Sequence, residues 1–148
     1  MTSASDERHI TGGCHCGTIR FTFVWPHAEG PIPVRACGCA FCRKHGGVYT
    51  SHPASRISIR IADPGLVKRY RFGTKTADFH VCRDCGVVPV ITSRIAGRDY
   101  AVVNVNSFEG VDPDELDRSP ADFEGETTEG RLARRQRTWI GQVELHDS

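Results

Sequence analysis

The stretch RACGCAFCRKHGG carries three cysteines within six positions, Cys37, Cys39 and Cys42. Three thiols cannot pair off as disulfides, and they are one short of the four ligands that zinc takes in closed structural sites. The stretch therefore predicts a metal site that is completed either by a fourth residue or by a substrate.

Two further cysteine pairs stand elsewhere in the chain, in GGCHCG and in FHVCRDCG. Glycine flanks each group, which allows tight turns and close approach of backbone N–H groups to thiolates. Residues i and i+2 of an extended segment project to one face, so a CxC pair can offer two sulfurs to one ion, and CxxC does the same across a turn. These spacings are typical of zinc-binding turns and favour Zn²⁺ as the cofactor.

The seven cysteines can be divided between two metal sites in two ways. One division makes a closed site from the two outer pairs and leaves the central three open: Cys14, Cys16, Cys82 and Cys85 against Cys37, Cys39 and Cys42. The other joins the two CxxC units in a zinc ribbon and leaves Cys14, Cys16 and Cys37 over. We favour the first, because it keeps each local cluster whole and closes a long loop.

The occupancy and the fourth ligand of the second site stay open at this point. His45, His52 and His80 are the candidates for a closing ligand, in which case the second site is structural too. Without metal, the same cysteines could serve as a thiol-based redox sensor.

Charge indicates what an open site with three cysteines could do. Three thiolates bring Zn²⁺ to about −1, so it is a weaker Lewis acid than a tris-histidine zinc, and activation of water is not its natural task. Holding a hydroxyl, a carbonyl oxygen or a thiol in position suits it better. Arg43, directly after Cys42, is predicted to offset the negative charge and to bind an anionic substrate.

The elements that must position these residues are predicted to be mainly β. TIRFTFVW alternates as a strand over 18–25, and RISIRI and LVKRYRF read as a hairpin around ADPG. VVPVITSRI and YAVVNVNSF read as a second hairpin around AGRD, with Pro89 indicating an edge or a bulge. Short helices are predicted at DPDEL, with Asp112 as N-cap, and at TTEGRLARRQ, and RTWIGQVEL is predicted to close the chain as a strand.

Composition limits the range of functions. A chain of 148 residues fits one domain, 1–148, and we expect residues 1–8 to be flexible. A formal net charge of +1 gives no bias toward nucleic acid or an anionic membrane, and we interpret RLARRQR as a solvated helix face. No apolar run approaches the roughly 20 residues of a membrane span, so a cytoplasmic location is expected. The oligomeric state is left open.

Four segments, GGCHCGTIRF, CGCAFCRKHGG, FHVCRDCG and VVNVNSF, occur in the order typical of a known family. The chain resembles the glutathione-dependent formaldehyde-activating enzyme family, whose domain is shared with centromere protein V. The resemblance implies tent-like β sheets around a structural zinc at Cys14, Cys16, Cys82 and Cys85, with a second zinc at Cys37, Cys39 and Cys42.

The same resemblance implies an activity. The family's founding reaction condenses formaldehyde with glutathione to S-hydroxymethylglutathione and is classed as a carbon–sulfur lyase. We therefore expect a zinc-dependent lyase acting on a thiol–aldehyde adduct, with a small-molecule thiol as partner and with Cys37, Cys39, Cys42 and Arg43 as catalytic residues. The alternative is a non-catalytic zinc module for protein or nucleic-acid interaction, as the centromere relative suggests.

Overall fold

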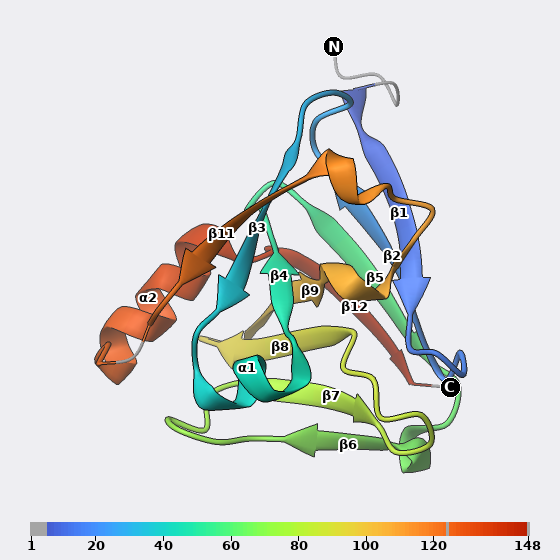
Figure 1. The fold of residues 1–148 in the computed structure, drawn as a ribbon. Coiled ribbons are helices and arrows are strands. Elements are labelled where there is room, and N and C mark those ends of the chain that lie inside the picture. The colour runs from blue at the N-terminus through green and yellow to red at the C-terminus, as the bar shows by residue number, and fades with distance from the viewer. Residues whose placement is uncertain (1–5, 124, 148) are drawn as a thin grey trace.

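The computed structural model describes residues 6–123 and 125–147, and most of its elements are strands (Figure 1). Five strands form one sheet in the order β10-β1-β2-β5-β12. Their bounds are β1 Arg8–Gly13, β2 Ile19–Trp25, β5 Arg56–Ile61, β10 Phe108–Glu109 and β12 Gln142–Asp147.

The second sheet has seven strands in the order β11-β3-β4-β9-β8-β7-β6. Its strands are β3 Ile32–Cys37, β4 Val48–Thr50, β6 Val67–Tyr70, β7 Asp78–Cys82, β8 Val90–Ile95, β9 Arg98–Asn104 and β11 Leu116–Ala121. The prediction of a mainly β fold is confirmed. Each sheet also contains one parallel pair at an edge, β11 with β3 and β12 with β5, which the sequence does not predict.

The helical elements are short. The α-helices are α1 Ala40–His45 and α2 Thr128–Thr138, and the 3₁₀ turns are η2 Pro64–Leu66, η3 Val105–Ser107 and η4 Pro113–Glu115. In the part of the chain that the structure describes, no helix combines the length and the apolar character that a membrane crossing requires.

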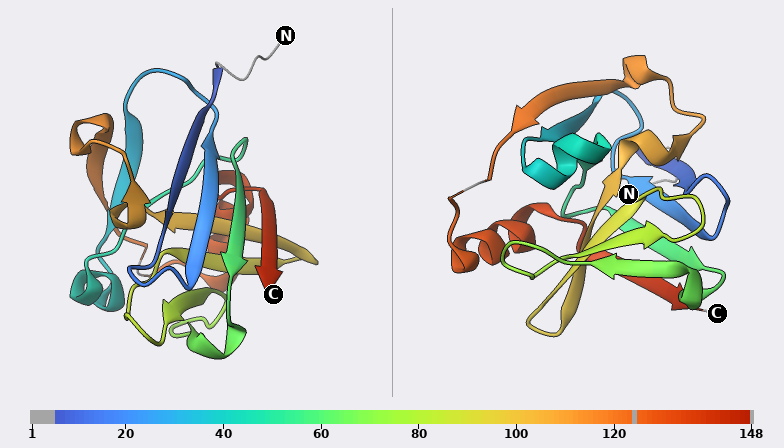
Figure 2. Two further views of the ribbon diagram at one scale, coloured as in Figure 1. Left: turned by 90° about the vertical axis from the view of Figure 1, so that its right-hand side faces the viewer. Right: turned by 60° about the horizontal axis from the view of Figure 1, so that its bottom comes forward.

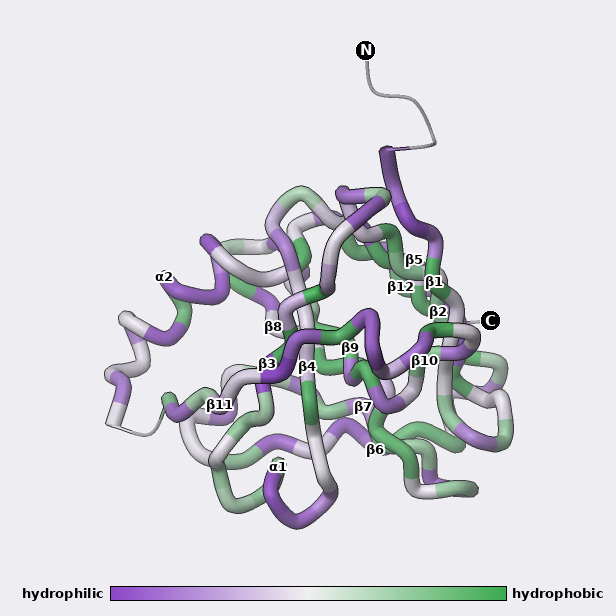
Figure 3. The backbone as a smooth tube through the Cα atoms, turned by 45° about the horizontal axis from the view of Figure 1, so that its top comes forward, coloured by the Kyte–Doolittle hydropathy of each residue, from purple (hydrophilic) through white to green (hydrophobic). Residues whose placement is uncertain are grey.

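The two sheets lean toward one another and give the molecule a tapered outline, with β6 and β7 across its broad end (Figures 1 and 2). The tube in Figure 3 is mostly green along β2 and β9 and mostly purple or pale along α2. β9 is buried on both faces: Val103 packs in the core between the sheets, and Val102 packs on the other side in a smaller cluster that includes Cys42 and Trp139. Burial on both faces explains why AVV, residues 101–103, reads as a continuous apolar run rather than an alternating one.

Two of the sequence predictions for strands are confirmed. The segment 18–25 contains β2, and the second hairpin is formed by β8 and β9. Its two-residue turn is made by Ala96 and Gly97, both with positive φ, which matches the twist of antiparallel strands. Pro89 stands directly before β8, which is an inner strand, and its carbonyl oxygen accepts a hydrogen bond from the Asn104 N–H at 2.8 Å.

The prediction of a hairpin between RISIRI and LVKRYRF is wrong in its pairing. Both segments contain strands, but β5 pairs with β2 and β12, whereas β6 pairs with β7 in the other sheet. The connecting ADPG forms η2, with the Asp63 side chain capping the Gly65 N–H at 2.9 Å. Alternation identifies a strand but not its partner, so a turn signal was mistaken for a hairpin.

The helix predictions hold with changes in extent. DPDEL forms η4 with a capping box between Asp112 and Glu115, and α2 continues to Thr138. The closing strand therefore begins only at Gln142. Of the start predicted to be flexible, residues 1–5 lie outside the described residues, and β1 begins at Arg8.

Gly12 gives a test of how β1 packs. A Cβ at this position would lie 2.2 Å from the Ser107 carbonyl oxygen and 2.6 Å from the Phe21 ring. Because backbone cannot move aside cheaply, we expect Gly12→Ala to lower the free energy of unfolding by about 2 kcal/mol, measured by urea denaturation. Thr11→Ala, at the exposed neighbouring position, is the control and should change it by less than about 0.5 kcal/mol. Equal stability of the two variants would contradict this packing.

Candidate metal centres and the adjoining cavity

The first cysteine cluster joins the two sheets. Cys14 and Cys16 lie in the turn between β1 and β2, Cys82 ends β7, and Cys85 lies in the turn after it. The four sulfurs lie within 4.8 Å of one another. Cys16 Sγ is 3.8 Å from Cys14 Sγ and 3.4 Å from Cys82 Sγ. A tetrahedral zinc with Zn–S distances of about 2.3 Å places its sulfurs about 3.8 Å apart, so this donor set fits the ion.

Backbone groups of the two turns point at these sulfurs. The Ile19 N–H donates to Cys14 Sγ at 3.2 Å, and the Cys85 N–H donates to Cys82 Sγ at 3.5 Å. Burial raises the pKa of the Cys14 thiol to about 12, whereas the hydrogen bond from the Thr18 hydroxyl lowers that of Cys16 to about 6. A metal ion that displaces the thiol protons would let all four sulfurs bind as thiolates.

The second cluster is built by β3 and α1. Cys37 ends β3, Cys39 is the N-cap of α1, and Cys42 lies one turn later. The end of β3 and one short helix thus bring the three sulfurs within 4.8 Å of one another. The Cys39 side chain accepts the Cys42 N–H at 3.4 Å. Gly46 ends the helix with φ of 74°, a left-handed conformation that glycine adopts without strain.

The ribbon arrangement is not formed. Cys39 and Cys42 lie with Cys37, and the second CxxC pair lies with Cys14 and Cys16. The structure thus brings the cysteines together as the four-plus-three division predicts.

None of the three candidate histidines joins the second cluster. His52 Nδ1 accepts the Ala54 N–H, and His80 is fully buried in β7 with Nε2 2.8 Å from the Thr92 hydroxyl. His45 Nε2 lies 2.9 Å from the Tyr49 hydroxyl. Among the described residues, no carboxylate or imidazole completes the set of three sulfurs.

Tyr49, which the sequence analysis missed, lies next to the second cluster. Its hydroxyl lies 3.2 Å from Cys42 Sγ, and burial raises its pKa, so the phenol stays protonated. Tyr49 therefore connects Cys42 to His45. An isolated tyrosine in the strand after the cysteine motif gives no local signal of this contact.

A cavity of about 470 Å³ opens beside the second cluster. All three cysteines and Tyr49 line it. Its apolar lining comes from α1, the segment before β7, the strands β7 to β9 and the C-terminal part of the chain: Ala40, Phe41, Phe72, Ala77, Phe79, Ile91, Val102, Phe123 and Trp139.

Four arginines also line this cavity: Arg35, Arg131, Arg134 and Arg135. Three of them belong to RLARRQR, so the interpretation of that stretch as a solvated helix face is wrong. Only 7% of Arg135 is exposed, because α2 packs against the seven-stranded sheet around Trp139. Burial lowers the pKa of Arg135 to about 10.

The structure does not bring Arg43 to the cavity. Its side chain lies exposed on α1 and is absent from the lining. The cations near the sulfurs come instead from β3 and α2. The hydrogen bond with Cys42 lowers the pKa of the Cys37 thiol to about 5, and the charge of Arg134 acts in the same direction.

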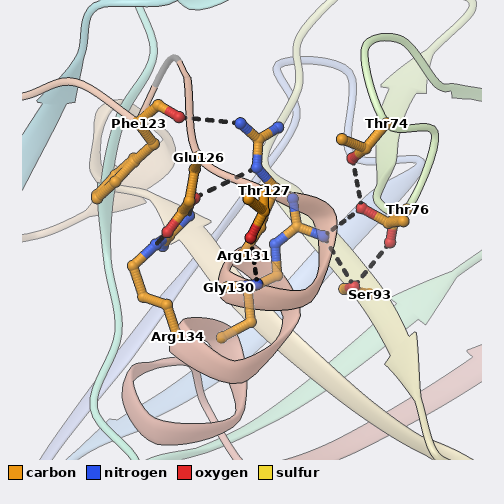
Figure 4. A network of polar contacts seen from close by, with 10 residues as sticks. Thr74, Thr76, Ser93, Phe123, Glu126, Thr127, Gly130, Arg131 and Arg134 are labelled. Atoms are coloured by element: carbon orange, nitrogen blue, oxygen red, sulfur yellow. Dashed lines mark hydrogen bonds and ion pairs between the residues drawn. The ribbon is translucent and has the colours of Figure 1, made fainter.

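A polar network holds α2 in place over the cavity (Figure 4). Glu126 accepts hydrogen bonds from Arg131 at 3.3 Å and from Arg134 at 2.9 Å, and Arg131 also donates to the Phe123 carbonyl oxygen. On the other side, Arg135 donates to the hydroxyls of Thr76 and Ser93, at 2.8 and 3.1 Å. The arginines are thus held in fixed positions.

Comparisons with known proteins agree with this architecture. A crystal structure of a Rhodobacter sphaeroides protein is similar with a TM-score of 0.50 and 29% sequence identity, over 74% of this chain and 97% of that one. A Halomonas elongata protein named "Putative glutathione-dependent formaldehyde-activating enzyme" is 47% identical over 83 residues. That match covers 51% of this chain and 51% of the Halomonas protein, so the chain spans about half the length of this relative.

The model of one protein family, described as glutathione-dependent formaldehyde-activating enzyme, matches residues 9–124. This range contains both cysteine clusters and every strand except β12 in full or nearly so. The chain therefore belongs to the glutathione-dependent formaldehyde-activating enzyme family.

Proposed function

We propose that the chain is a zinc-dependent carbon–sulfur lyase that forms or breaks the adduct of a thiol with a small aldehyde, such as S-hydroxymethylglutathione. The observation that carries the proposal is the set of three cysteine sulfurs facing a cavity, with no fourth protein ligand among the described residues. Membership of the family supports a reaction related to glutathione and formaldehyde. We further propose that it works in the cytoplasm, where thiols stay reduced.

Each cluster has a separate role in this proposal. The four sulfurs of Cys14, Cys16, Cys82 and Cys85 would hold a structural zinc, and those of Cys37, Cys39 and Cys42 would hold a second. When bound there, zinc supplies a Lewis acid that can polarise an oxygen or a thiol group.

The side chains around the second cluster would position the reactants. The apolar walls would limit the access of water, and Arg35 and Arg134 would offset the negative charge of the sulfurs and of a bound anion. The Tyr49 hydroxyl would donate to Cys42 Sγ and so reduce the charge on that sulfur. In the forward direction the sulfur–carbon bond forms, the carbonyl π bond opens, and the thiol proton ends on the aldehyde oxygen; the reverse reaction undoes each change. Because thiols add to aldehydes unaided, proximity in the cavity accounts for much of the rate.

The cavity also favours this proposal over the alternative of a non-catalytic zinc module. A module that only presents a folded surface has no use for a cavity lined by sulfurs, arginines and aromatic rings.

Metal content tests the division between the two sites. We expect Cys42→Ser to lose one of two zinc ions while its far-UV circular dichroism stays native, because α1 can form without the metal. Cys85→Ser should lose the ion that joins the sheets and unfold, since a structural zinc contributes directly to folding. The two matched substitutions are compared by metal analysis of the purified proteins. Unfolding of Cys42→Ser with retained folding of Cys85→Ser would reverse the assigned roles.

Catalysis is tested by NMR exchange spectroscopy of formaldehyde with glutathione and with other small thiols. The wild-type protein should accelerate exchange between free and adduct forms for at least one thiol, and Cys42→Ser should lose that acceleration by about 100-fold or more. Thr11→Ala, far from the cavity, should keep it. If no thiol exchanges faster with wild-type protein than without it, the chain is not this lyase.

A further inference from the structure

The cavity beside the second cluster has an aromatic wall. The rings of Phe41, Phe72 and Phe79 contact one another in all three pairs, with centroids 5.0 to 5.1 Å apart. Phe41 lies in α1 between Cys39 and Cys42, so the wall begins directly beside the sulfurs. Three adjoining rings at this position offer stacking and edge contacts to a planar, apolar group.

Two of the arginines that line the cavity have hydrogen-bonding capacity left over. Arg35 is half-buried, and its hydrogen bond among the described residues goes to the Ser51 hydroxyl at 3.0 Å, without a carboxylate partner. Arg135 is 7% exposed; its Nη1 binds Thr76 and Ser93, and its Nε is buried without a hydrogen-bond partner among the described residues, so Arg135 contributes mainly positive charge to the cavity. A buried guanidinium costs free energy unless an anion or acceptor satisfies it.

The other two arginines are already paired. Arg131 and Arg134 both contact the carboxylate of Glu126. Among the described residues that line the cavity, four are arginines and none is acidic. A ligand with a carboxylate therefore finds a hydrogen-bond partner in Arg35 and further positive charge in the other arginines, whereas a ligand with an ammonium group meets like charges.

Glutathione combines two carboxylates with an ammonium group and has no apolar group to place against the phenylalanine rings. The lining described here fits a different thiol better. Such a thiol has a planar ring for the wall and a carboxylate for the arginines, and it has no cationic group.

We propose that the thiol half of the adduct carries an aromatic ring and a carboxylate, with the ring on Phe41, Phe72 and Phe79 and the carboxylate on Arg35. This inference rests on the proposed lyase function, because it names the substrate class of that same site. With formaldehyde, the thiol sulfur forms a bond to carbon, the C=O π bond opens, and the thiol proton ends on the new hydroxyl group. No oxidant or other co-reactant is needed.

The first test compares thiols in the exchange assay with formaldehyde and wild-type protein. 4-(Mercaptomethyl)benzoate should be accelerated at least about tenfold more than glutathione, because its ring can stack on the phenylalanine rings and it carries no ammonium group that the arginines would repel. Its methyl ester lacks the charge, and 3-mercaptopropionate lacks the ring. Exchange of both should be accelerated less than that of the aromatic acid and more than that of glutathione. Glutathione exchanging as fast as the aromatic acid overturns the inference and leaves the lyase function standing, whereas no acceleration for any thiol refutes the lyase function.

The second test measures binding without chemistry. Titration calorimetry with 4-(hydroxymethyl)benzoate should show binding, with at least about tenfold weaker binding of its methyl ester to the same wild-type protein. Arg35→Met should weaken binding of the acid to the level of the ester. Arg137→Met, an exposed arginine of α2 outside the lining, is the matched control and should bind like wild type.

The comparison of acid and ester needs no variant, so it decides the question even if Arg35→Met fails to fold. Equal binding of acid and ester, or equal loss in Arg35→Met and Arg137→Met, would show that the arginines do not select an anion. This readout is independent of whether the protein catalyses the exchange.

Discussion

The contact on which the structure depends most is the meeting of four cysteine sulfurs between the two sheets. Cys14 and Cys16 belong to the five-stranded sheet, and Cys82 and Cys85 follow from the seven-stranded one. The buried core between the sheets contains residues of both, and Cys14 and Cys82 belong to it. A metal ion held by these four sulfurs would stabilise the fold by closing the long loop between the two pairs.

The same arrangement places the second cluster. Strand β7 carries Cys82 at its end, and its residue Phe79 lines the cavity, so the strand that is fixed by the first cluster also forms a wall of the second site. β9 connects the two regions in a similar way, because alternate residues face the central core and the cavity. Displacement of the first cluster should therefore also move residues that line the cavity, even though the two sets of sulfurs share no residue.

The sequence predicted the metal centres better than it predicted the cavity. The grouping of the cysteines follows from spacings of two and three residues, which the local backbone largely determines. Strands with regular alternation, such as β2, could be found for the same reason. The pairing of β5, the parallel edge pairs and the position of Arg135 depend on residues far apart in the chain, and no local pattern encodes them. Arg43 was favoured because it is adjacent to Cys42, but in an α-helix neighbouring residues point in different directions.

The cysteines and most of the arginines that line the cavity come from different parts of the chain. All seven cysteines precede residue 86, whereas three of the four arginines and the carboxylate that orients two of them lie between residues 126 and 135. Substitutions in this short segment would alter which molecules are selected while leaving the metal ligands untouched. A fold arranged in this way can diversify its specificity through its last quarter and keep its reaction chemistry constant.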